Sequence, residues 1–412
     1  MKIIHITASY KPAYIYGGPI QSVGKLCEVL SGDNRLAVGE DAFKVEVLTT
    51  TANGAKELDV KIGEPVLVEG VRVTYFKRWT KDHSHFSPGL LWGLRKMLGQ
   101  VGRDRQNKPP RLADTPPKEG NVIHIHAWWN LVSVLSCFIA RWYGIPVVLS
   151  PRGMLTSYTL GNRNSLSKRL THKLLGKNLL AYCHIHATSE QERADILSIV
   201  KPKSIRVIPN LVSLDLGETG GPYQVASNKE LTKDCFKLIF LSRIEEKKGL
   251  ELLFNALSTI DISWRLTIAG SGDKQYLQSL KQLARELKLS DKIYWLGQVN
   301  NQDKYTLMAA HDLLALTSYN ENFANVVVES LSVGTPVLIS KQVGLADYVE
   351  DKKLGWVTGL EISEIREQIL NAFQSFTKRS EIRNNSSSII KKDFSDQTLV
   401  EKYINMYIQN GE

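Results

Sequence analysis

The fold of this 412-residue chain is decided by the stretch Thr317-Ser318-Tyr319-Asn320-Glu321-Asn322-Phe323-Ala324-Asn325-Val326-Val327-Val328-Glu329-Ser330-Leu331. An apolar run over residues 313–316 precedes it, and Gly334-Thr335-Pro336 with a second apolar run, 337–339, follows it. This order predicts a buried strand, a polar turn, a short helix that begins at Asn325, a glycine stop and another strand. The pattern is typical of a parallel α/β sheet.

The polar turn and the helix also predict a ligand. A helix that follows a strand presents free backbone N–H groups at the mouth of the sheet, and these groups suit a phosphate. Glu321 lies on the turn and Glu329 about one turn into the helix, whose side chains lean back toward its N-terminus. Because carboxylates accept hydrogen bonds from sugar hydroxyls, the combination indicates a nucleotide sugar. The alternative is that residues 326–328 form a strand and the two glutamates are ordinary surface residues.

The spacing of the two glutamates carries a family resemblance. Seven residues separate Glu321 from Glu329, which resembles the Glu-x7-Glu element of retaining glycosyltransferases with the GT-B fold. The wider pattern Glu-Asn-Phe-Ala-Asn-x3-Glu, followed by Gly-Thr-Pro, is similar to the GT4-type family. That family usually has Gly at the position of Asn322 and often Gly or Pro at that of Ala324. Asn tolerates left-handed backbone geometry, so we expect the turn to form with Asn322 in place.

The resemblance implies an α/β fold of two Rossmann-like, doubly wound parallel-sheet domains that face a cleft. It implies that a UDP-sugar or GDP-sugar binds the second domain, with the backbone of Phe323, Ala324 and Asn325 at its phosphates. Glu321 would then hold hydroxyls of the transferred sugar, and Glu329 those of the ribose. No cofactor is expected. Because no Asp-x-Asp motif lies beside the predicted donor pocket, no metal is expected either.

The composition narrows the class of protein. The length is too great for one core and sufficient for two. The net charge of +10 suggests an anionic partner, which can be nucleic acid, anionic lipid or a phosphorylated substrate. The scattered residues Cys27, Cys137, Cys183 and Cys235 predict reduced core thiols of a cytoplasmic protein. No apolar run approaches membrane-spanning length, and the first six residues predict a strand rather than a signal peptide.

Alternating apolar and amphipathic runs predict two α/β domains, 1–213 and 235–396, joined by a polar linker over 214–234. A final helix, about 397–412, is expected to pack back on the first domain, as the resemblance implies. Residues 103–120 predict a surface loop. Strands are predicted at 3–7, 44–50, 71–76, 122–126, 146–150, 184–188, 205–208, 236–242, 265–269, 293–296, 313–316, 337–340 and 355–357. Helices are predicted at 19–30, 88–98, 131–142, 166–180, 189–199, 250–259, 274–287, 302–311, 325–333, 346–350 and 362–376.

Two motifs of the first half lie at predicted strand ends. Gly17-Gly18-Pro19 follows the first strand, where glycines let the backbone approach a ligand and proline suits the first helical position. The resemblance implies that Gly17 and Gly18 face the donor phosphates and the acceptor; the alternative is a tight turn only. His124 and His126 end a later strand, and we expect their rings on opposite faces of it. The resemblance assigns His126 to the sugar and the scissile phosphate, and leaves His124 structural.

Two more residues of the first half are candidates for acceptor binding. Trp128 either lines an acceptor pocket or packs in the core. Arg152 lies in Ser-Pro-Arg-Gly-Met-Leu at a predicted strand end, where its planar fork suits an acceptor phosphate or a sugar oxygen. This motif resembles a subset of GT4-type enzymes that build bacterial surface polysaccharides. The alternative is a surface arginine before a turn.

A basic amphipathic stretch occupies residues 162–180. It carries cations interleaved with leucines and no acidic residue: Arg163, Lys168, Arg169, Lys173 and Lys177. Such a helix can lie on anionic lipid, at the inner face of the plasma membrane, while the alternative is a solvated helix with one core face. Nucleic acid is not expected as a partner, since no recognised binding module is present.

The second half supplies cations at the predicted donor site. Arg243 and Lys248 follow its first strand, and their fork and point charge suit a diphosphate leaving group. The Arg-x4-Lys-Gly spacing matches the GT4-type family, which implies that role for both residues. Gly270, in Ala-Gly-Ser-Gly, resembles the family's loop near the nucleotide. The resemblance also places the backbone of Val299 where the base binds.

Together these features predict a retaining, metal-independent hexosyltransferase with His126, Arg243, Lys248 and Glu321 in catalytic roles. It is expected to move a sugar from a nucleotide-diphosphate sugar to a lipid-linked or growing polysaccharide acceptor in bacterial surface glycan synthesis. Two other interpretations stay open. A nucleotide-sugar epimerase of the same architecture would form product without an acceptor. A non-catalytic basic scaffold for lipid or nucleic acid would bind no donor.

Overall fold

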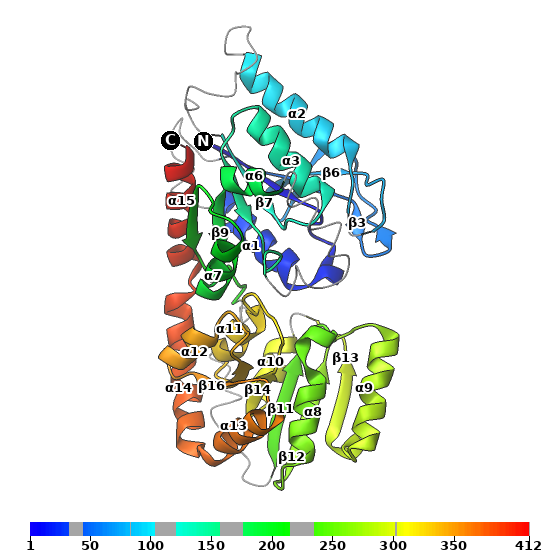
Figure 1. The fold of residues 1–412 in the computed structure, drawn as a ribbon, viewed down its shortest axis with the longest axis vertical. Helices are drawn as coiled ribbons and strands as arrows, with labels where there is room; N and C mark the ends of the chain where they lie inside the picture. Colours follow the sequence, from blue (N-terminus) through cyan, green and yellow to red (C-terminus); the bar gives the residue numbers. More distant parts are fainter. Residues whose placement is uncertain are drawn as a thin grey trace. The chain divides into compact units, whose positions relative to one another are not determined.

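The computed structural model describes residues 1–32, 44–82, 84–103, 121–156, 176–214, 235–300 and 303–411. The chain divides into two compact units (Figure 1). Unit 1 is Met1–Ser213 together with Asp396–Glu412, and unit 2 is Leu214–Ser395. Within the described ranges, no helix is both long and apolar enough to cross a membrane. The predicted linker over 214–234 and the predicted loop over 103–120 fall almost entirely outside the described residues.

Unit 1 is built on a mostly parallel sheet. Its strands are β1 (Lys2–Thr7), β2 (Lys44–Thr50), β3 (Ala52–Asn53), β4 (Lys56–Glu57), β5 (Pro65–Val68), β6 (Val71–Phe76), β7 (Asn121–His126), β8 (Val147–Ser150), β9 (His184–Ala187) and β10 (Ser204–Val207). Across the described residues the sheet order is β10-β9-β8-β7-β1-β2-β6-β5, and only β5 pairs antiparallel within it. Central β7 is buried almost throughout, whereas β6, beside the edge, alternates between buried and more exposed residues.

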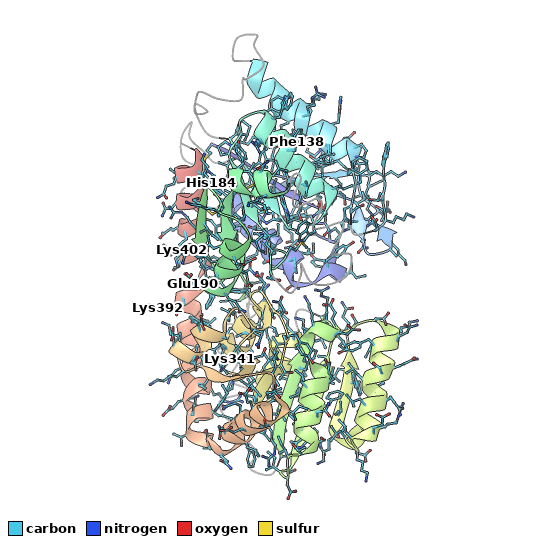
Figure 2. The ribbon with its side chains drawn as sticks, in the orientation of Figure 1. Phe138, His184, Glu190, Lys341, Lys392 and Lys402 are labelled. Carbon is cyan, nitrogen blue, oxygen red and sulfur yellow. The ribbon has the colours of Figure 1, made fainter. Side chains whose placement is uncertain are left out.

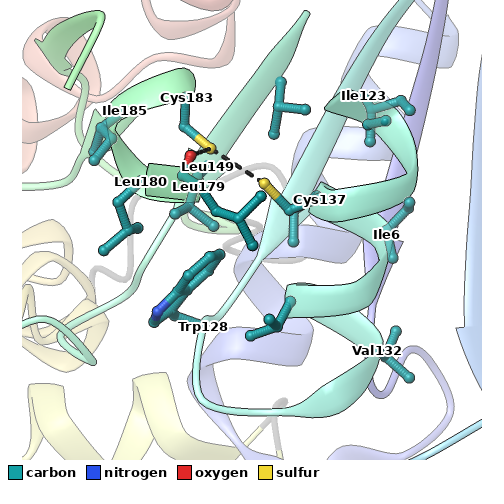
Figure 3. Packing of buried hydrophobic residues seen from close by; sticks show 14 of the residues in the cluster. Ile6, Ile123, Trp128, Val132, Cys137, Leu149, Leu179, Leu180, Cys183 and Ile185 are labelled. Carbon is teal, nitrogen blue, oxygen red and sulfur yellow. Dashed lines mark hydrogen bonds between the residues drawn. The ribbon is translucent and has the colours of Figure 1, made fainter. Parts of the chain in front are cut away.

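Helices pack against this sheet around an apolar core. They are α1 (Gly18–Gly32), α2 (Pro88–Arg103), α3 (Leu131–Trp142), α6 (Lys177–Tyr182), α7 (Glu190–Ile199) and α15 (Asp396–Gly411), with a short 3₁₀ turn η1 (Tyr14–Tyr16). The side chain of Asn130 starts α3 by accepting a hydrogen bond from the backbone N–H of Ser133. Figure 3 shows the core that surrounds Trp128, in which the sulfur atoms of Cys137 and Cys183 lie 3.5 Å apart as free thiols.

Unit 2 repeats the plan with a fully parallel sheet. Its strands are β11 (Phe236–Leu241), β12 (Trp264–Ala269), β13 (Ile293–Gly297), β14 (Leu313–Leu316), β15 (Val337–Ser340) and β16 (Gly355–Thr358), in the order β13-β12-β11-β14-β15-β16. Its helices are α8 (Leu250–Ser258), α9 (Lys274–Glu286), α10 (Asp303–Ala309), α11 (Asn325–Ser332), α12 (Ala346–Asp351), α13 (Ile362–Gln374) and α14 (Phe376–Asp393), with 3₁₀ turns η4 (Glu246–Lys248) and η5 (Ser290–Lys292). The predicted class, two doubly wound parallel-sheet domains, is confirmed.

The sequence patterns did not predict α14, β5 or the short β3–β4 ribbon. The buried side of α14 includes Arg379, Ile382, Ser386 and Ile390, so its inward face is half polar. One of these polar residues, Ser386, donates a hydrogen bond to the carbonyl of Leu331 on α11. A helix that packs through polar groups shows no apolar stripe in its sequence, and the pattern therefore missed it.

Candidate functional site

The candidate residues of unit 2 lie at a reversal of strand order. β11 is the first strand, β12 and β13 follow on one side of it, and β14 to β16 follow on the other. In sheets of this kind ligands bind outside the carboxyl ends of the strands at that reversal. The loop that carries Arg243 and Lys248 leaves β11, and the turn that carries Glu321 leaves β14. The sheet topology thus places both loops at the same point.

These two loops are joined by close backbone contacts. Gly249 adopts a left-handed conformation (φ 63°), and a Cβ atom there would lie only 2.1 Å from the carbonyl oxygen of Thr317. The hydroxyl of Thr317 donates to the carbonyl of Gly249 over 2.8 Å, and the N–H of Tyr319 donates to the carbonyl of Lys247 over 2.8 Å. The side chain of Lys248 is consequently held against the turn after β14.

Lys248 forms an ion pair with Glu321, and both side chains are largely buried. The backbone of Glu321 is fixed as well: its N–H donates to Gln342 and its carbonyl accepts from Gly344. Burial raises the pKa of Glu321, but the ammonium groups of Lys248 and Lys247 outweigh it and hold the pKa of that carboxyl below its ordinary value. Glu321 is therefore a fixed, ionised acceptor.

Glu329 has a partner that the sequence patterns did not predict. The ammonium group of Lys304 on α10 donates to Oε1 of Glu329 over 2.8 Å, and only 10% and 6% of the two side chains are exposed. Within the described part of the chain, Lys304 is the one hydrogen-bond partner of the Glu329 carboxylate, whereas the backbone carbonyl of Glu329 accepts from Ser332. In the structure Lys304 lies on the buried face of α10 together with Tyr305 and Met308. A lysine at such a position needs a counter-ion.

The start of α11 departs from the expected geometry in one respect. The residue in left-handed conformation is Ala324 (φ 68°), whereas Asn322 does not have a positive φ angle. The expectation that Asn322 provides this conformation is therefore corrected, since the bend lies immediately before the helix. Phe323, Ala324 and Asn325 stand at the N-terminal end of α11, where backbone N–H groups have no acceptor within the helix.

The remaining candidates of unit 2 lie on neighbouring strand ends. Gly270 follows β12, and a Cβ atom there would lie 1.8 Å from the carbonyl oxygen of Ser242, so no other residue fits. Val299 is partly exposed just after β13. Arg243 is 44% exposed and pairs with Glu245 over 2.7 Å. Its charge is accessible, in contrast to that of Lys248.

The candidate residues of unit 1 also lie at a reversal of strand order, between β1 and β7. Gly17 (φ 69°) and Gly18 follow β1 and begin α1, and His126 is the last residue of β7. Arg152 follows β8, the next strand of the sheet, in a left-handed conformation (φ 53°). A positive φ angle is uncommon for arginine and marks a position that the surrounding structure imposes.

Arg152 is held by neutral groups from three parts of unit 1. Its Nη1 donates to Ser22 Oγ on α1 over 2.9 Å and to Asn210 Oδ1 after β10 over 3.0 Å. Its Nε lies 3.4 Å from Nδ1 of His126. Among the described residues these hydrogen-bond partners are all neutral, and the nearest recorded negative charge is that of Glu192, which accepts from the backbone N–H of Gly153 over 2.7 Å and acts on Arg152 without a recorded ion pair.

The expectation that His124 and His126 point to opposite faces of β7 was wrong. Their ring centroids are 4.1 Å apart, because residues two positions apart in a strand share a face. His126 Nδ1 faces the Arg152 donor, so the proton of the neutral ring lies on Nε2 and is donated to His5 Nδ1 over 3.0 Å. The remaining N–H of His5 is buried without a partner in the structure.

A second chain of hydrogen bonds runs through His124. The carbonyl of Ile208 accepts from Nε2 of His186, so Nδ1 of His186 accepts from the hydroxyl of Ser150. Ser150 in turn accepts from Nε2 of His124, whose Nδ1 accepts from the hydroxyl of Tyr407 on α15. The donors and acceptors of this chain are all assigned, and it ties α15 to the strands that carry His126 and Arg152.

Burial keeps these histidines neutral. It lowers the pKa of His5 and of His186 to about 3 each, and it lowers the pKa of His124 and His126 well below the ordinary value. The charge of Arg152 lowers the pKa of all four further. A neutral His126 can form hydrogen bonds but carries no charge.

One ring nitrogen each of His5, His124 and His126 lies within 4.8 Å of the other two, which is close enough for a metal site. The guanidinium of Arg152 lies beside His126 and opposes a second cation there. The nitrogens of His126 and His5 that face each other already share a proton. The arrangement fits a hydrogen-bonded network better than a metal site.

Two further predictions for unit 1 concern Trp128 and the basic helix over residues 162–180. Trp128 is fully buried in the core, so it cannot line an acceptor pocket, and core packing is its role. Most of the predicted basic helix, including Arg163, Lys168, Arg169 and Lys173, lies outside the described residues. Lys177 is described, and it is exposed at the start of α6.

Two family models match successive parts of the chain. The one described as a glycosyl transferase 4-like domain matches residues 34–211, and the one described as glycosyl transferases group 1 matches residues 225–389. The chain belongs to the GT4-type glycosyltransferases. A D-inositol 3-phosphate glycosyltransferase of Pseudarthrobacter chlorophenolicus is 25% identical to this GT4-type chain over 322 residues, 75% of this chain and 72% of that protein. An uncharacterized glycosyltransferase of Methanocaldococcus jannaschii is 24% identical over 99% of this chain and 98% of its own.

Solved structures share the fold of this GT4-type glycosyltransferase over nearly its whole length. Sucrose-phosphate synthase from Thermosynechococcus elongatus has a TM-score of 0.71 at 19% identity and covers 99% of this chain and 98% of its own. The Anabaena protein HepE, in complex with UDP-glucose, has a TM-score of 0.68 at 20% identity and covers 99% and 100%. The expected GT-B fold is confirmed.

Proposed function

We propose that this GT4-type glycosyltransferase is a retaining hexosyltransferase that uses a UDP-sugar or GDP-sugar. Its acceptor is a lipid-linked or growing polysaccharide in bacterial surface glycan synthesis. The observation that carries the donor assignment is the pairing of Lys248 with Glu321 and of Lys304 with Glu329 at one end of the unit 2 sheet. Two fixed carboxylates beside a helix start offer acceptors for hydroxyls together with donors for phosphates. The UDP-glucose complex of HepE supports UDP as the nucleotide.

The donor binds through groups with separate tasks. N–H groups at the start of α11, from Phe323 to Asn325, and the side chains of Arg243 and Lys248 hold the diphosphate. Gly270 and the backbone of Val299 lie beside the base. Glu321 accepts hydrogen bonds from the transferred sugar.

Glu329 accepts hydrogen bonds from the ribose. Lys304 occupies its Oε1 and leaves Oε2 without another partner among the described residues. One carboxylate oxygen is thereby oriented by the protein and the other is left to the ligand. Lys304 is a positioning residue, because it acts on the donor through Glu329.

The acceptor binds unit 1, with Arg152 at its anionic group. Within the described ranges the guanidinium donates hydrogen bonds to neutral groups, so a phosphate would give it a charged hydrogen-bond partner. The relative named as a D-inositol 3-phosphate glycosyltransferase supports an acceptor that carries phosphate. Gly17 and Gly18 allow the backbone to approach the reacting groups, and neutral His126 offers hydrogen bonds to the sugar.

The reaction breaks the bond between the anomeric carbon and the diphosphate oxygen, and negative charge grows on the departing oxygen. Arg243, Lys248 and the α11 N–H groups stabilise that charge where it develops. The acceptor oxygen forms the new bond to the same carbon, with the configuration retained, and its proton passes to the departing nucleoside diphosphate. No metal ion is needed for this step, because the cations and the helix start supply the positive charge.

A nucleotide-sugar screen by thermal shift tests the donor assignment, since a ligand raises the unfolding midpoint of the protein that binds it. We expect a UDP-sugar or a GDP-sugar to raise the midpoint, and sugar transfer to occur only when an acceptor is added. Product formed from the donor alone would indicate an epimerase. A midpoint that no nucleotide sugar moves would favour the non-catalytic scaffold.

A further inference from the structure

Helix α3 is apolar on both of its sides. One side, which includes Val132, Val134, Cys137 and Ala140, is buried in the core of unit 1. The other side carries the stripe Leu131, Leu135, Phe138 and Trp142, at successive spacings of four, three and four residues. Leu131 is 41%, Phe138 46% and Trp142 61% exposed, and Figure 2 labels Phe138 on this helix. An apolar helix face left in water usually marks a binding surface.

The neighbouring helices extend this surface with aromatic and basic side chains. α3 packs against α2 and against α6, so their outer surfaces adjoin (Figure 1). Trp92 on α2 is 66% exposed, with the ammonium group of Lys96 5.4 Å from the centre of its ring. Arg95 on α2 and Lys177 on α6 are exposed, and Arg141 lies on α3 itself.

Carboxylates are missing from these helices. The sequence contains no Asp or Glu from Ser84 to Arg103, and none from Asn121 to Ser189, which together include all of α2, α3 and α6. Elsewhere the chain carries 42 acidic residues, so this stretch stands apart from the rest of the sequence. The three helices therefore contribute apolar, aromatic and cationic side chains and no carboxylate; the nearest recorded carboxylate is that of Asp82, in the loop whose Ser84 accepts from the N–H of Leu131.

We propose that the outer surface of α2, α3 and α6 is a docking surface for an anionic phospholipid bilayer. Trp92, Phe138, Trp142 and the exposed Leu131 enter the interface between headgroups and acyl chains, where aromatic side chains are enriched. Arg95, Lys96, Arg141 and Lys177 contact the headgroup phosphates, with their aliphatic stems along the apolar surface. The binding holds the enzyme at the membrane without a spanning helix.

The charge of this surface distinguishes the bilayer from a second copy of the chain. In a symmetric dimer the same surface faces itself, which would bring the cations of both copies together, and α2, α3 and α6 supply no carboxylate to pair with them. An anionic bilayer matches both the charge and the aromatic composition. The inference does not rest on the proposed donor or acceptor, and its test measures no sugar transfer.

Sedimentation of the full chain with two kinds of vesicle tests the proposal. One is phosphatidylcholine alone, and the other is equal parts phosphatidylcholine and phosphatidylglycerol. Wild type should bind the anionic vesicles at low ionic strength and lose much of that binding as salt is added. The variant Arg95→Gln/Lys96→Gln changes two exposed positions and should fold. It should bind anionic vesicles about 20- to 30-fold more weakly, at about fivefold for each charge removed.

The apolar contribution has its own matched pair of variants. Phe138→Ser/Trp142→Ser should lower binding roughly tenfold or more at every salt concentration. Leu67→Ser/Trp79→Ser removes two exposed apolar side chains elsewhere in unit 1 and should bind as wild type does. Circular dichroism and the unfolding midpoint report whether each variant folds.

Three results would overturn the proposal. The first is the absence of wild-type binding to anionic vesicles at low salt, and the second is unchanged binding by the Arg95/Lys96 variant. The third is a concentration-dependent dimer that the Phe138/Trp142 variant abolishes in the absence of vesicle binding. That last outcome would show that the surface joins two copies of the chain.

Discussion

The two units hold their candidate residues at equivalent positions of their sheets, but the buried charges of those residues have different partners. Both put them at a reversal of strand order, β11/β14 in unit 2 and β1/β7 in unit 1. Unit 2 pairs each buried lysine with a glutamate, as Lys248 with Glu321 and Lys304 with Glu329. At its candidate site unit 1 places Arg152 among neutral serine, asparagine and histidine groups, although Arg78 elsewhere in unit 1 is buried and paired with Glu57.

This difference predicts that the paired charges of unit 2 affect ligand binding and that the neutral network of unit 1 affects stability. Paired charges can be shared with a ligand, because phosphates and hydroxyls can join the lysines and glutamates at little loss of hydrogen bonding. The neutral network of unit 1, by contrast, is closed on itself through His124, Ser150 and His186. The loss of this network should lower stability more than it alters binding of the donor.

The largest effect is expected where a buried charge of unit 2 loses its partner. Lys304→Met leaves the buried carboxylate of Glu329 unpaired and should destabilise the protein by about 3–5 kcal/mol. The double variant Lys304→Met/Glu329→Gln removes both charges and should recover most of that stability without recovering nucleotide binding. Chemical denaturation measures the first effect and calorimetric titration with a nucleoside diphosphate the second. Single and double variants of equal stability would show that the pair is not coupled.

The next effect concerns catalysis by the cations of unit 2. Replacing Lys248 or Arg243 by Ala should lower the turnover number by roughly 100-fold or more, because the charge acts on the leaving diphosphate. The control is Lys352→Ala, which breaks the half-exposed pair of Lys352 with Asp393 in the same unit and should leave turnover unchanged. Steady-state kinetics on the true substrates measures both. Near-normal turnover in both the Lys248 and the Arg243 variants would refute the assignment.

A smaller effect should separate the two glutamates of unit 2. Glu329→Gln is expected to weaken the free nucleoside diphosphate and the full donor alike, since both contain the ribose. Glu321→Gln should leave the diphosphate nearly unchanged and lower sugar transfer, since only the donor carries the sugar. About tenfold or more is expected for one hydrogen bond to a charged acceptor. Calorimetric titration with both ligands measures this, and equal losses in both variants would place the two carboxylates on the same part of the donor.

Unit 1 should respond through stability. Tyr407→Phe removes the hydroxyl that donates to buried His124 and should lower the free energy of unfolding by about 1 kcal/mol. Tyr14→Phe is the matched control, because Tyr14 is 45% exposed. Donor affinity should be the same in both variants. A Tyr407→Phe protein as stable as the control would show that the hydrogen bond contributes nothing to folding.

The smallest effect is a change in acid sensitivity of unit 1. The pKa of His5 is lowered to about 3, so between about pH 3 and pH 6.5 the unfolded chain binds a proton there that the folded protein does not. Stability should therefore rise with pH across that window. His5→Leu should flatten the rise by up to one proton, measured as the slope of unfolding free energy against pH. An unchanged slope would mean that His5 is protonated in the folded protein.

Sequence patterns alone determined the fold class and the main candidates of unit 2. Alternating apolar runs predicted the parallel strands because burial on both faces requires continuous apolar residues. The Glu321–Glu329 spacing and the Lys248-Gly249 pair are local features, close enough in sequence to be recognised without knowing which strands adjoin.

Only the tertiary structure decided the partners of these residues. Lys304 lies 25 residues from Glu329, and Tyr407 lies 283 residues from His124, so no periodicity links them. Trp128 could be assigned to the core, and the α3 stripe to the surface, only once the packing of α3 was known. The physical reason is that side-chain alternation determines which face of an element a residue occupies. What covers that face depends on the order of strands and on the helices that the rest of the chain supplies.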